Sequence, residues 1–182
     1  MFRMDSYAAA GGNFFDTADV YGLGQSERVL GNWLVRQGKR DSFVIATKAR
    51  IRTDMHDVNG AGNSRKHLMA ALDQSLGHLQ TPYVDMFQLH AWDPSTPLEE
   101  TLRTLHEMVR SGRVRYVGVS NFTGWQLQKF QDTAKHLGLE RAVSLQPQYN
   151  LLQRGIEAEL VPVCENEGLG ISKLCSQTIT FR

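Results

Sequence analysis

Phe43-Val44-Ile45-Ala46-Thr47-Lys48 is the stretch that decides the fold. It is mostly apolar on both faces, which is typical of a strand in a parallel sheet that is covered on both sides. Similar short runs recur along the chain, at residues 13–16, 83–90, 114–120, 142–146 and 170–174. We therefore expect these runs to form one parallel sheet.

Segments with helical periodicity lie between the runs. Thr96 is predicted to cap one helix, with Pro97 at its first position and Glu99 completing a capping box. Further helix starts are predicted at Ser26, Ser64 and Thr123. The alternation of strand and helix predicts right-handed crossovers, in a sheet that is either open and doubly wound or closed as a barrel. Residues 22–27 lack the third glycine of the dinucleotide-binding fingerprint, which disfavours the doubly wound alternative.

Composition narrows the class of protein. The chain has 182 residues, which predicts a single domain over residues 1–182. Its 20 Lys and Arg against 19 Asp and Glu give a net charge of +1, too small to gather nucleic acid or anionic lipid. The two cysteines are too few for a disulfide scaffold, and no signal peptide or membrane-spanning run is found. We expect a cytoplasmic protein that binds neither nucleic acid nor membranes.

Polar side chains follow nearly every predicted strand at the point where it ends. They are Asp16, Lys48, His90, Ser120, Asn121 and Gln146. In an eight-stranded β/α barrel the carboxyl ends of all strands face one mouth, so these groups would converge on one pocket. A single polar residue at a strand end is often only the first solvated position of a loop. The succession of complementary types favours a functional site.

The residue types at these strand ends suggest acid–base chemistry. Asp16 and Lys48 are expected to form a buried ion pair, with the phenol of Tyr21 over it. A close ammonium favours the phenolate and lowers the pKa of a tyrosine, which makes Tyr21 a candidate proton donor. His90 is expected to orient a carbonyl oxygen. Trp92, two residues later, is expected either to line the substrate pocket or to pack within its loop.

The amide and hydroxyl groups of Ser120, Asn121 and Gln146 are suited to holding a carboxamide by hydrogen bonds. The remaining histidines have no carboxylate partner at ligand spacing, so we predict no metal site. The sequence also lacks a Gly-x-Ser-x-Gly turn and paired catalytic carboxylates, which disfavours a hydrolase.

The motifs together resemble the aldo-keto reductase family over about nine-tenths of the chain. They lie at residues 12–22 (GNFFDTADVYG), 45–48 (IATK), 85–90 (DMFQLH), 112–122 (GRVRYVGVSNF) and 146–150 (QPQYN). The resemblance implies a (β/α)8 TIM barrel that reduces aldehydes or ketones to alcohols with NADPH. It matches Asp16, Tyr21, Lys48 and His90 to the catalytic tetrad, and Ser120, Asn121 and Gln146 to the contacts of the nicotinamide carboxamide.

The chain departs from the family at both ends. A β/α barrel typically needs about 250 residues, so we expect an incomplete barrel in which strands 1 and 8 of the family are missing. Residues 173–182 are predicted to form a divergent tail, as in a truncated isoform. The missing strands would leave two open edges, which are expected to favour self-association.

Two functions remain open from the sequence. One is an NADPH-dependent reductase of a small-molecule carbonyl substrate, with Tyr21 as the proton donor. The other is a catalytically inert fragment, or a regulatory or interaction protein on the same fold, similar to the potassium-channel β-subunits. The four tetrad-type residues favour the first function, and the missing strands favour the second.

Overall fold

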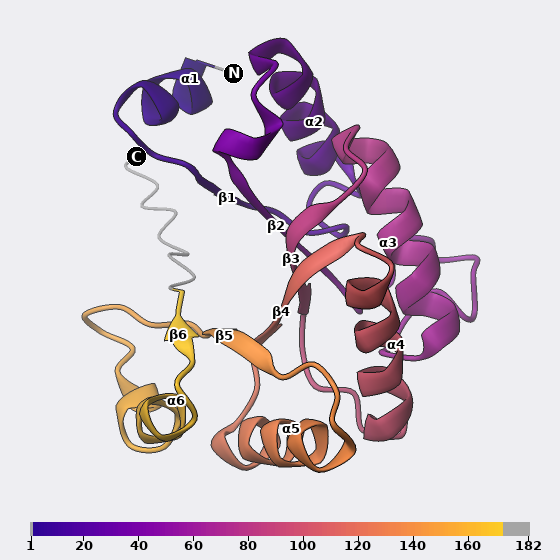
Figure 1. The fold of residues 1–182 in the computed structure, drawn as a ribbon, viewed down its shortest axis with the longest axis vertical. Helices are drawn as coiled ribbons and strands as arrows, with labels where there is room; N and C mark the ends of the chain where they lie inside the picture. Colours follow the sequence, from indigo (N-terminus) through magenta and orange to yellow (C-terminus); the bar gives the residue numbers. More distant parts are fainter. Residues whose placement is uncertain (1, 173–182) are drawn as a thin grey trace.

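The fold is a curled sheet of six parallel strands with helices along its outer face (Figure 1). The computed structural model describes residues 2–172. The strands are β1 (Phe14–Asp16), β2 (Val44–Ala49), β3 (Val84–Leu89), β4 (Val114–Ser120), β5 (Ala142–Gln146) and β6 (Gly170–Ile171). The predicted tail at 173–182 lies outside the described residues.

The strands follow one another in the sheet in their sequence order, from β1 to β6. A doubly wound sheet reverses its strand order at a switch point, so the doubly wound alternative is wrong. The fold is an incomplete α/β barrel, as the sequence predicts. Within the described chain β1 pairs only with β2, and β6 only with β5, so the sheet has two open edges.

One helix precedes β1, and the others connect the successive strands. They are α1 (Phe2–Ala9), α2 (Gln25–Gln37), α3 (Arg65–Leu79), α4 (Leu98–Arg110), α5 (Gly124–Leu137) and α6 (Leu160–Glu167), with short 3-10 turns at η1 (Arg40–Ser42) and η2 (Gly155–Glu157). Figure 1 shows α2, α3, α4 and α5 following one another around the outside of the sheet. This arrangement buries the outward faces of the strands, and the carboxyl ends of all the strands lie at the same end of the sheet.

Two of the predicted helix starts are confirmed. The Ser64 side chain caps α3 by accepting a hydrogen bond from the backbone N–H of His67. Thr123 and Gln126 form a capping box at the start of α5. Both caps satisfy backbone N–H groups that have no partner inside a helix.

The other two starts differ from the prediction. α2 begins at Gln25, one residue before Ser26. α4 begins at Leu98, and the capping box predicted at Thr96 is wrong. The reason is that the Thr96 hydroxyl donates to the Asp93 carboxylate at 2.7 Å, so it closes the preceding loop instead of capping the helix.

The hydrophobic core lies between the outer face of the sheet and the helices. Its largest buried side chains come from both layers, and include Trp33, Ile45, Leu72, Phe87, Leu102 and Phe130. Phe15 and Phe43 pack against the Trp33 indole, with ring centroids 4.8 Å away in each case. These contacts join α2 to β1 and to the residue that precedes β2.

A close contact between α2 and α3 depends on a glycine. A methyl group on Gly31 would lie 2.4 Å from the backbone oxygen of His78 and 2.7 Å from the carbonyl carbon of Leu79. Backbone atoms cannot rotate away as side chains do, so the two helices would have to separate. Gly77, inside α3, has open space at the same position.

We therefore predict opposite effects for the same substitution at two helical glycines. Gly31→Ala should lower the free energy of unfolding by about 1–3 kcal/mol through overpacking. Gly77→Ala should raise it by about 0.5–1 kcal/mol, because alanine loses less backbone entropy in a helix. Urea titrations of both variants and the parent chain measure the two shifts. Equal effects at both positions would contradict the packing that we describe.

Candidate active site

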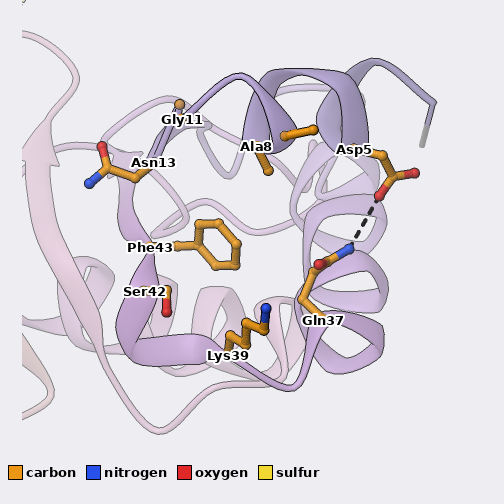
Figure 2. Close-up of a pocket in the computed structure, with 10 residues that line it drawn as sticks. Asp5, Ala8, Gly11, Asn13, Gln37, Lys39, Ser42 and Phe43 are labelled. Carbon is orange, nitrogen blue, oxygen red and sulfur yellow. Dashed lines mark hydrogen bonds between the residues drawn. The ribbon is translucent and has the colours of Figure 1, made fainter.

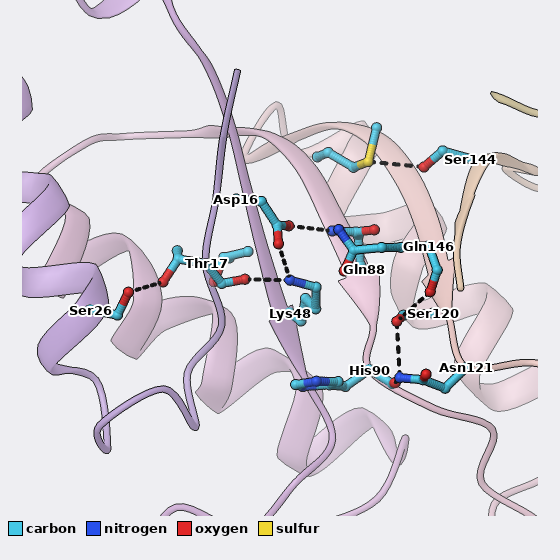
Figure 3. Close-up of polar contacts among 12 residues, drawn as sticks. Asp16, Thr17, Ser26, Lys48, Gln88, His90, Ser120, Asn121, Ser144 and Gln146 are labelled. Carbon is cyan, nitrogen blue, oxygen red and sulfur yellow. Dashed lines mark hydrogen bonds and ion pairs between the residues drawn. The ribbon is translucent and has the colours of Figure 1, made fainter. Parts of the chain in front are cut away.

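The polar residues predicted at the strand ends lie together at the carboxyl ends of the parallel strands. Asp16 and Ser120 end β1 and β4, Gln146 ends β5, and His90 follows β3 directly. The parallel register pairs Ser120 with Gln146 across β4 and β5. Figure 3 shows one region that contains Asp16, Lys48, His90, Ser120, Asn121 and Gln146, which lie in β1 to β5 or directly follow these strands.

The predicted ion pair is at the centre of this region. Lys48 Nζ lies 2.5 Å from Asp16 Oδ2 and donates a second hydrogen bond to the backbone oxygen of Thr17 at 2.9 Å. The Lys48 side chain has no exposed surface, whereas that of Asp16 is 23% exposed. Burial lowers the pKa of Lys48, and the charge of Asp16 opposes this shift. The carboxylate therefore helps to keep a buried ammonium charged.

Tyr21 lies in the loop between β1 and α2, beside the pair. Its ring centroid is 5.2 Å from Lys48 Nζ and 5.9 Å from the His90 ring, which it meets edge to face. The pKa of Tyr21 is raised, first by burial and then by the charge of Asp16. The expectation that Lys48 lowers this pKa is wrong for the structure, because the buried setting of Tyr21 and the charge of Asp16 dominate.

His90 is nearly buried, and its backbone N–H is bound to the Ala49 oxygen. Its pKa is lowered to about 4, first by burial and then by the charge of Lys48. The imidazole is therefore neutral near pH 7 and carries one N–H donor. Its Nδ1 atom is buried without a hydrogen-bond partner in the described part of the chain.

Ser120, Asn121 and Gln146 form the far side of the region. The Ser120 hydroxyl donates to the Gln146 backbone oxygen at 2.8 Å. The Asn121 amide nitrogen donates to the His90 backbone oxygen and to Ser120 Oγ, each at 3.0 Å. The Gln146 side-chain oxygen is buried and has no hydrogen-bond partner within residues 2–172.

Trp92 lies in the loop after His90, where its half-buried ring joins a cluster of aromatic side chains. It meets Phe122 at 5.3 Å and Trp125 at 5.6 Å between ring centroids, both roughly edge to face. Trp125 is 57% exposed, so this part of the cluster reaches the surface. Trp92 also lines a cavity of about 330 Å³ with residues 93–99 and Lys129. Both proposed roles, pocket lining and loop packing, are compatible with this position.

Sequence reasoning assigned no role to two buried carboxyl groups next to the site. Asp19 is 3% exposed, and its pKa is raised to about 7, chiefly by burial. Glu27 is fully buried and accepts hydrogen bonds from Thr47 Oγ1 at 2.6 Å and from His78 Nδ1 at 3.1 Å. The sequence signal that could have indicated a buried Glu27 is its position one turn before Leu30, on the buried face of α2.

Sequence reasoning also assigned no role to Gln88, whose side-chain amide donates to Asp16 Oδ1 at 3.0 Å (Figure 3). It is the last residue but one of β3, where the sequence pattern alone assigns a side chain to the core or to the surface. The signal that could have found it is a polar residue among the apolar residues of a strand buried on both faces.

A separate cavity of about 460 Å³ lies at the opposite end of the strands (Figure 2). It is lined by residues that precede β1 and β2, among them Gly11, Asn13, Ser42 and Phe43, and by Asp5 and Gln37, which are hydrogen-bonded to each other. Since the candidate site is at the carboxyl ends of these strands, the two regions are distinct.

None of the helices within residues 2–172 combines the length and apolar character needed to cross a membrane. In the same residues, no three His, Cys, Asp or Glu side chains gather as metal ligands would.

Comparisons with known proteins find reductases and a dehydrogenase. The model of the Aldo/keto reductase family matches residues 2–177. Norsolorinic acid reductase B of Dothistroma septosporum is 37% identical over 174 residues, covering 93% of this chain and 44% of that protein. The NADP(+) aryl-alcohol dehydrogenase of Phanerodontia chrysosporium is 34% identical over 177 residues, covering 93% and 46%. Aldo-keto reductase ausK of Emericella nidulans is 35% identical over 178 residues, covering 94% and 45%. The chain thus spans less than half the length of each.

We predict that His90 stays neutral at neutral pH and titrates with a midpoint near pH 4. Unfolded histidine binds its proton near pH 6.5, so the contribution of His90 to stability should be lost as the pH falls from about 6.5 toward 4. NMR of the imidazole carbons measures the midpoint, and Lys48→Met should raise it by removing a nearby positive charge. A midpoint at the ordinary histidine value would contradict the buried position of the ring.

Proposed function

Because the chain belongs to the aldo/keto reductase family, we propose that it is an oxidoreductase that reduces aldehydes or ketones to alcohols with NADPH. The observation that carries this proposal is the Asp16–Lys48 ion pair with the Tyr21 ring beside it. The names of the relatives, which are reductases and a dehydrogenase, support carbonyl–alcohol chemistry. We further propose that the protein acts in the cytoplasm.

Tyr21 is the proposed proton donor. Its raised pKa keeps the phenol protonated at neutral pH, so the proton is present when a carbonyl oxygen begins to gain negative charge. As the proton leaves, the Lys48 ammonium stabilises the phenolate that forms. Asp16 keeps Lys48 charged and in place through the 2.5 Å contact.

His90 is the proposed hydrogen-bond donor to the substrate. The neutral imidazole has one N–H, which can hold the carbonyl oxygen beside the Tyr21 phenol. A neutral ring suits this role, because it orients the oxygen without competing with Tyr21 as the acid. The edge-to-face contact with Tyr21 keeps the two side chains adjacent.

Ser120, Asn121 and Gln146 are proposed to hold the carboxamide of NADPH, which supplies a hydride when it is bound. The buried, unpartnered side-chain oxygen of Gln146 fits this group, because a carboxamide nitrogen can donate to it. The Asn121 amide nitrogen already has two acceptors, so its oxygen remains to accept a further hydrogen bond. Both of these oxygens are acceptors, so they suit the NH2 group of a carboxamide.

Trp92 is proposed to contact the substrate at the mouth of the barrel. The aromatic surface that it forms with Trp125 is suited to a flat, apolar substrate. One relative is named for an aryl alcohol, which agrees with an aromatic substrate class. We propose an aromatic aldehyde as the first compound to test.

A second candidate function is a non-catalytic interaction protein on the same fold. The observation that favours it is the incomplete barrel, together with a span of 44–46% of the relatives' length. NADPH titration of the purified chain, followed by fluorescence, separates the two functions. Binding that depends on Gln146 supports the reductase, and no binding at millimolar NADPH supports the alternative.

We predict that Tyr21→Phe lowers the rate of NADPH-dependent reduction of an aromatic aldehyde by about 10²–10⁴-fold, since it removes the proton donor. The loss of NADPH absorbance measures the rate. Tyr116→Phe is the matched control, because Tyr116 is 59% exposed on β4, and its rate should be unchanged. An unchanged rate for Tyr21→Phe in an active chain would remove Tyr21 from the mechanism.

We also propose that the chain self-associates through its open sheet edges. Phe14 on β1 and Ile171 on β6 are each 37% exposed there, beside strand backbone that has no pairing partner among residues 2–172. Light scattering should then give a mass above the 20.5 kDa of one chain. Phe14→Lys, which adds a charge at the edge, should reduce association, while Val35→Lys on the exposed face of α2 should not. A 20.5 kDa species in the parent chain would overturn the proposal.

A further inference from the structure

We propose that Gln88 is a positioning residue, whose side-chain amide holds the Asp16 carboxylate in the orientation that pairs it with Lys48. The inference rests on the proposed function for its catalytic meaning, and on the contacts below for its geometry. Gln88 touches neither Tyr21 nor His90 through any hydrogen bond in the described chain. It acts through Asp16.

The two oxygens of Asp16 have different partners. Oδ2 is 2.5 Å from Lys48 Nζ, and Oδ1 accepts from Gln88 Nε2 at 3.0 Å (Figure 3). A carboxylate only accepts hydrogen bonds, so the amide nitrogen of Gln88, and not its oxygen, must face Asp16. With both oxygens engaged, the carboxylate cannot rotate about its own bond without losing a contact.

Asp16 needs this second contact because of where it lies. It is the last residue of a three-residue strand at an open edge of the sheet, and its side chain is 23% exposed. Gln88, by contrast, is fully buried in β3, and its register partner on β2 is Lys48. Because β3 lies inside the sheet, Gln88 has a firmly held position from which it can orient the Asp16 carboxylate on the edge strand β1.

The surroundings of Gln88 leave its side chain little freedom. A methyl group added at Gly118 on β4 would lie 2.9 Å from Gln88 Cγ. The absence of a side chain at Gly118 thus makes the space that Gln88 occupies, and β4 closes that space on the far side. The amide is held against Asp16 by packing as well as by its hydrogen bond.

A comparison with a second buried glutamine argues against a purely structural role. Gln131 in α5 satisfies both ends of its amide on the backbone of Ala142, donating at 3.0 Å and accepting at 2.9 Å. Gln88 uses only its nitrogen, and its oxygen is buried without a partner among residues 2–172. A glutamine that served stability alone would pair both ends, as Gln131 does. The contact with Asp16 is what the Gln88 amide provides.

The test follows the titration of Lys48 by NMR in the whole chain labelled with 13C-lysine. Gln88→Met keeps the length of the side chain and removes the donor. Lys48 should then titrate about one pH unit lower than in the parent, since a loosened Asp16 stabilises the ammonium less. Asp16→Asn sets the size of the full loss. Gln131→Met is the matched control, with the same buried amide removed elsewhere, and should leave the Lys48 midpoint unchanged.

Gln88→Asn gives a second measurement if Gln88→Met does not fold, because its amide is one methylene too short to reach Asp16. An unchanged Lys48 midpoint in the folded Gln88 variant overturns the proposal, as does an equal shift in Gln131→Met. Where the parent chain is active, kcat should fall about tenfold with KM for the aldehyde unchanged. If the parent is inactive while the midpoint still shifts, the proposed function fails and the positioning role stands.

Discussion

The side chain of Lys48 has no exposed surface, and the groups at the carboxyl ends of the strands keep its ammonium charged. Burial alone lowers its pKa, so a buried ammonium persists only with close acceptors. Asp16 Oδ2 and the Thr17 backbone oxygen supply them at 2.5 and 2.9 Å. Both acceptors come from the end of β1, whereas Lys48 lies on β2. The candidate site therefore forms only when β1 pairs with β2 in the sheet.

The loop that carries Tyr21 is fixed by the same strand. The backbone N–H groups of Thr17 and Asp19 donate to the oxygens of Ala46 and Lys48, which extends the ladder of β1 and β2 into the loop. Asp19 adds a second carboxyl group near Lys48, and its pKa of about 7 makes its charge depend on pH within the neutral range. Tyr21, the proposed proton donor, and the ion pair are therefore both supported by β1, although they lie in different elements.

The sequence predicted the positions of the strands from local patterns, although the run at 170–174 is a strand only at Gly170–Ile171 within the described residues. Apolar runs fixed β4 and β5 to the residue, and Ser64 and Thr123 were read correctly as caps. Thr96 was misread because its hydroxyl is taken by Asp93, a contact that no helical pattern reveals. The pKa of Tyr21 and the contact of Gln88 with Asp16 could not be predicted, since they depend on burial and on distances between strands.

The sequential order of the strands also bears on how the chain folds during synthesis. Each strand from β2 onward pairs with the strand made just before it, so the sheet needs no late-made strand between two early ones. Contacts between strands adjacent in sequence close shorter loops than contacts between distant strands would, which lowers the entropy cost of forming them. A chain that leaves the ribosome from its N-terminus can thus join Asp16 to Lys48 first, then add Gln88, and gain Ser120 and Gln146 last. The strand order thus allows the candidate site to be assembled in the order of translation.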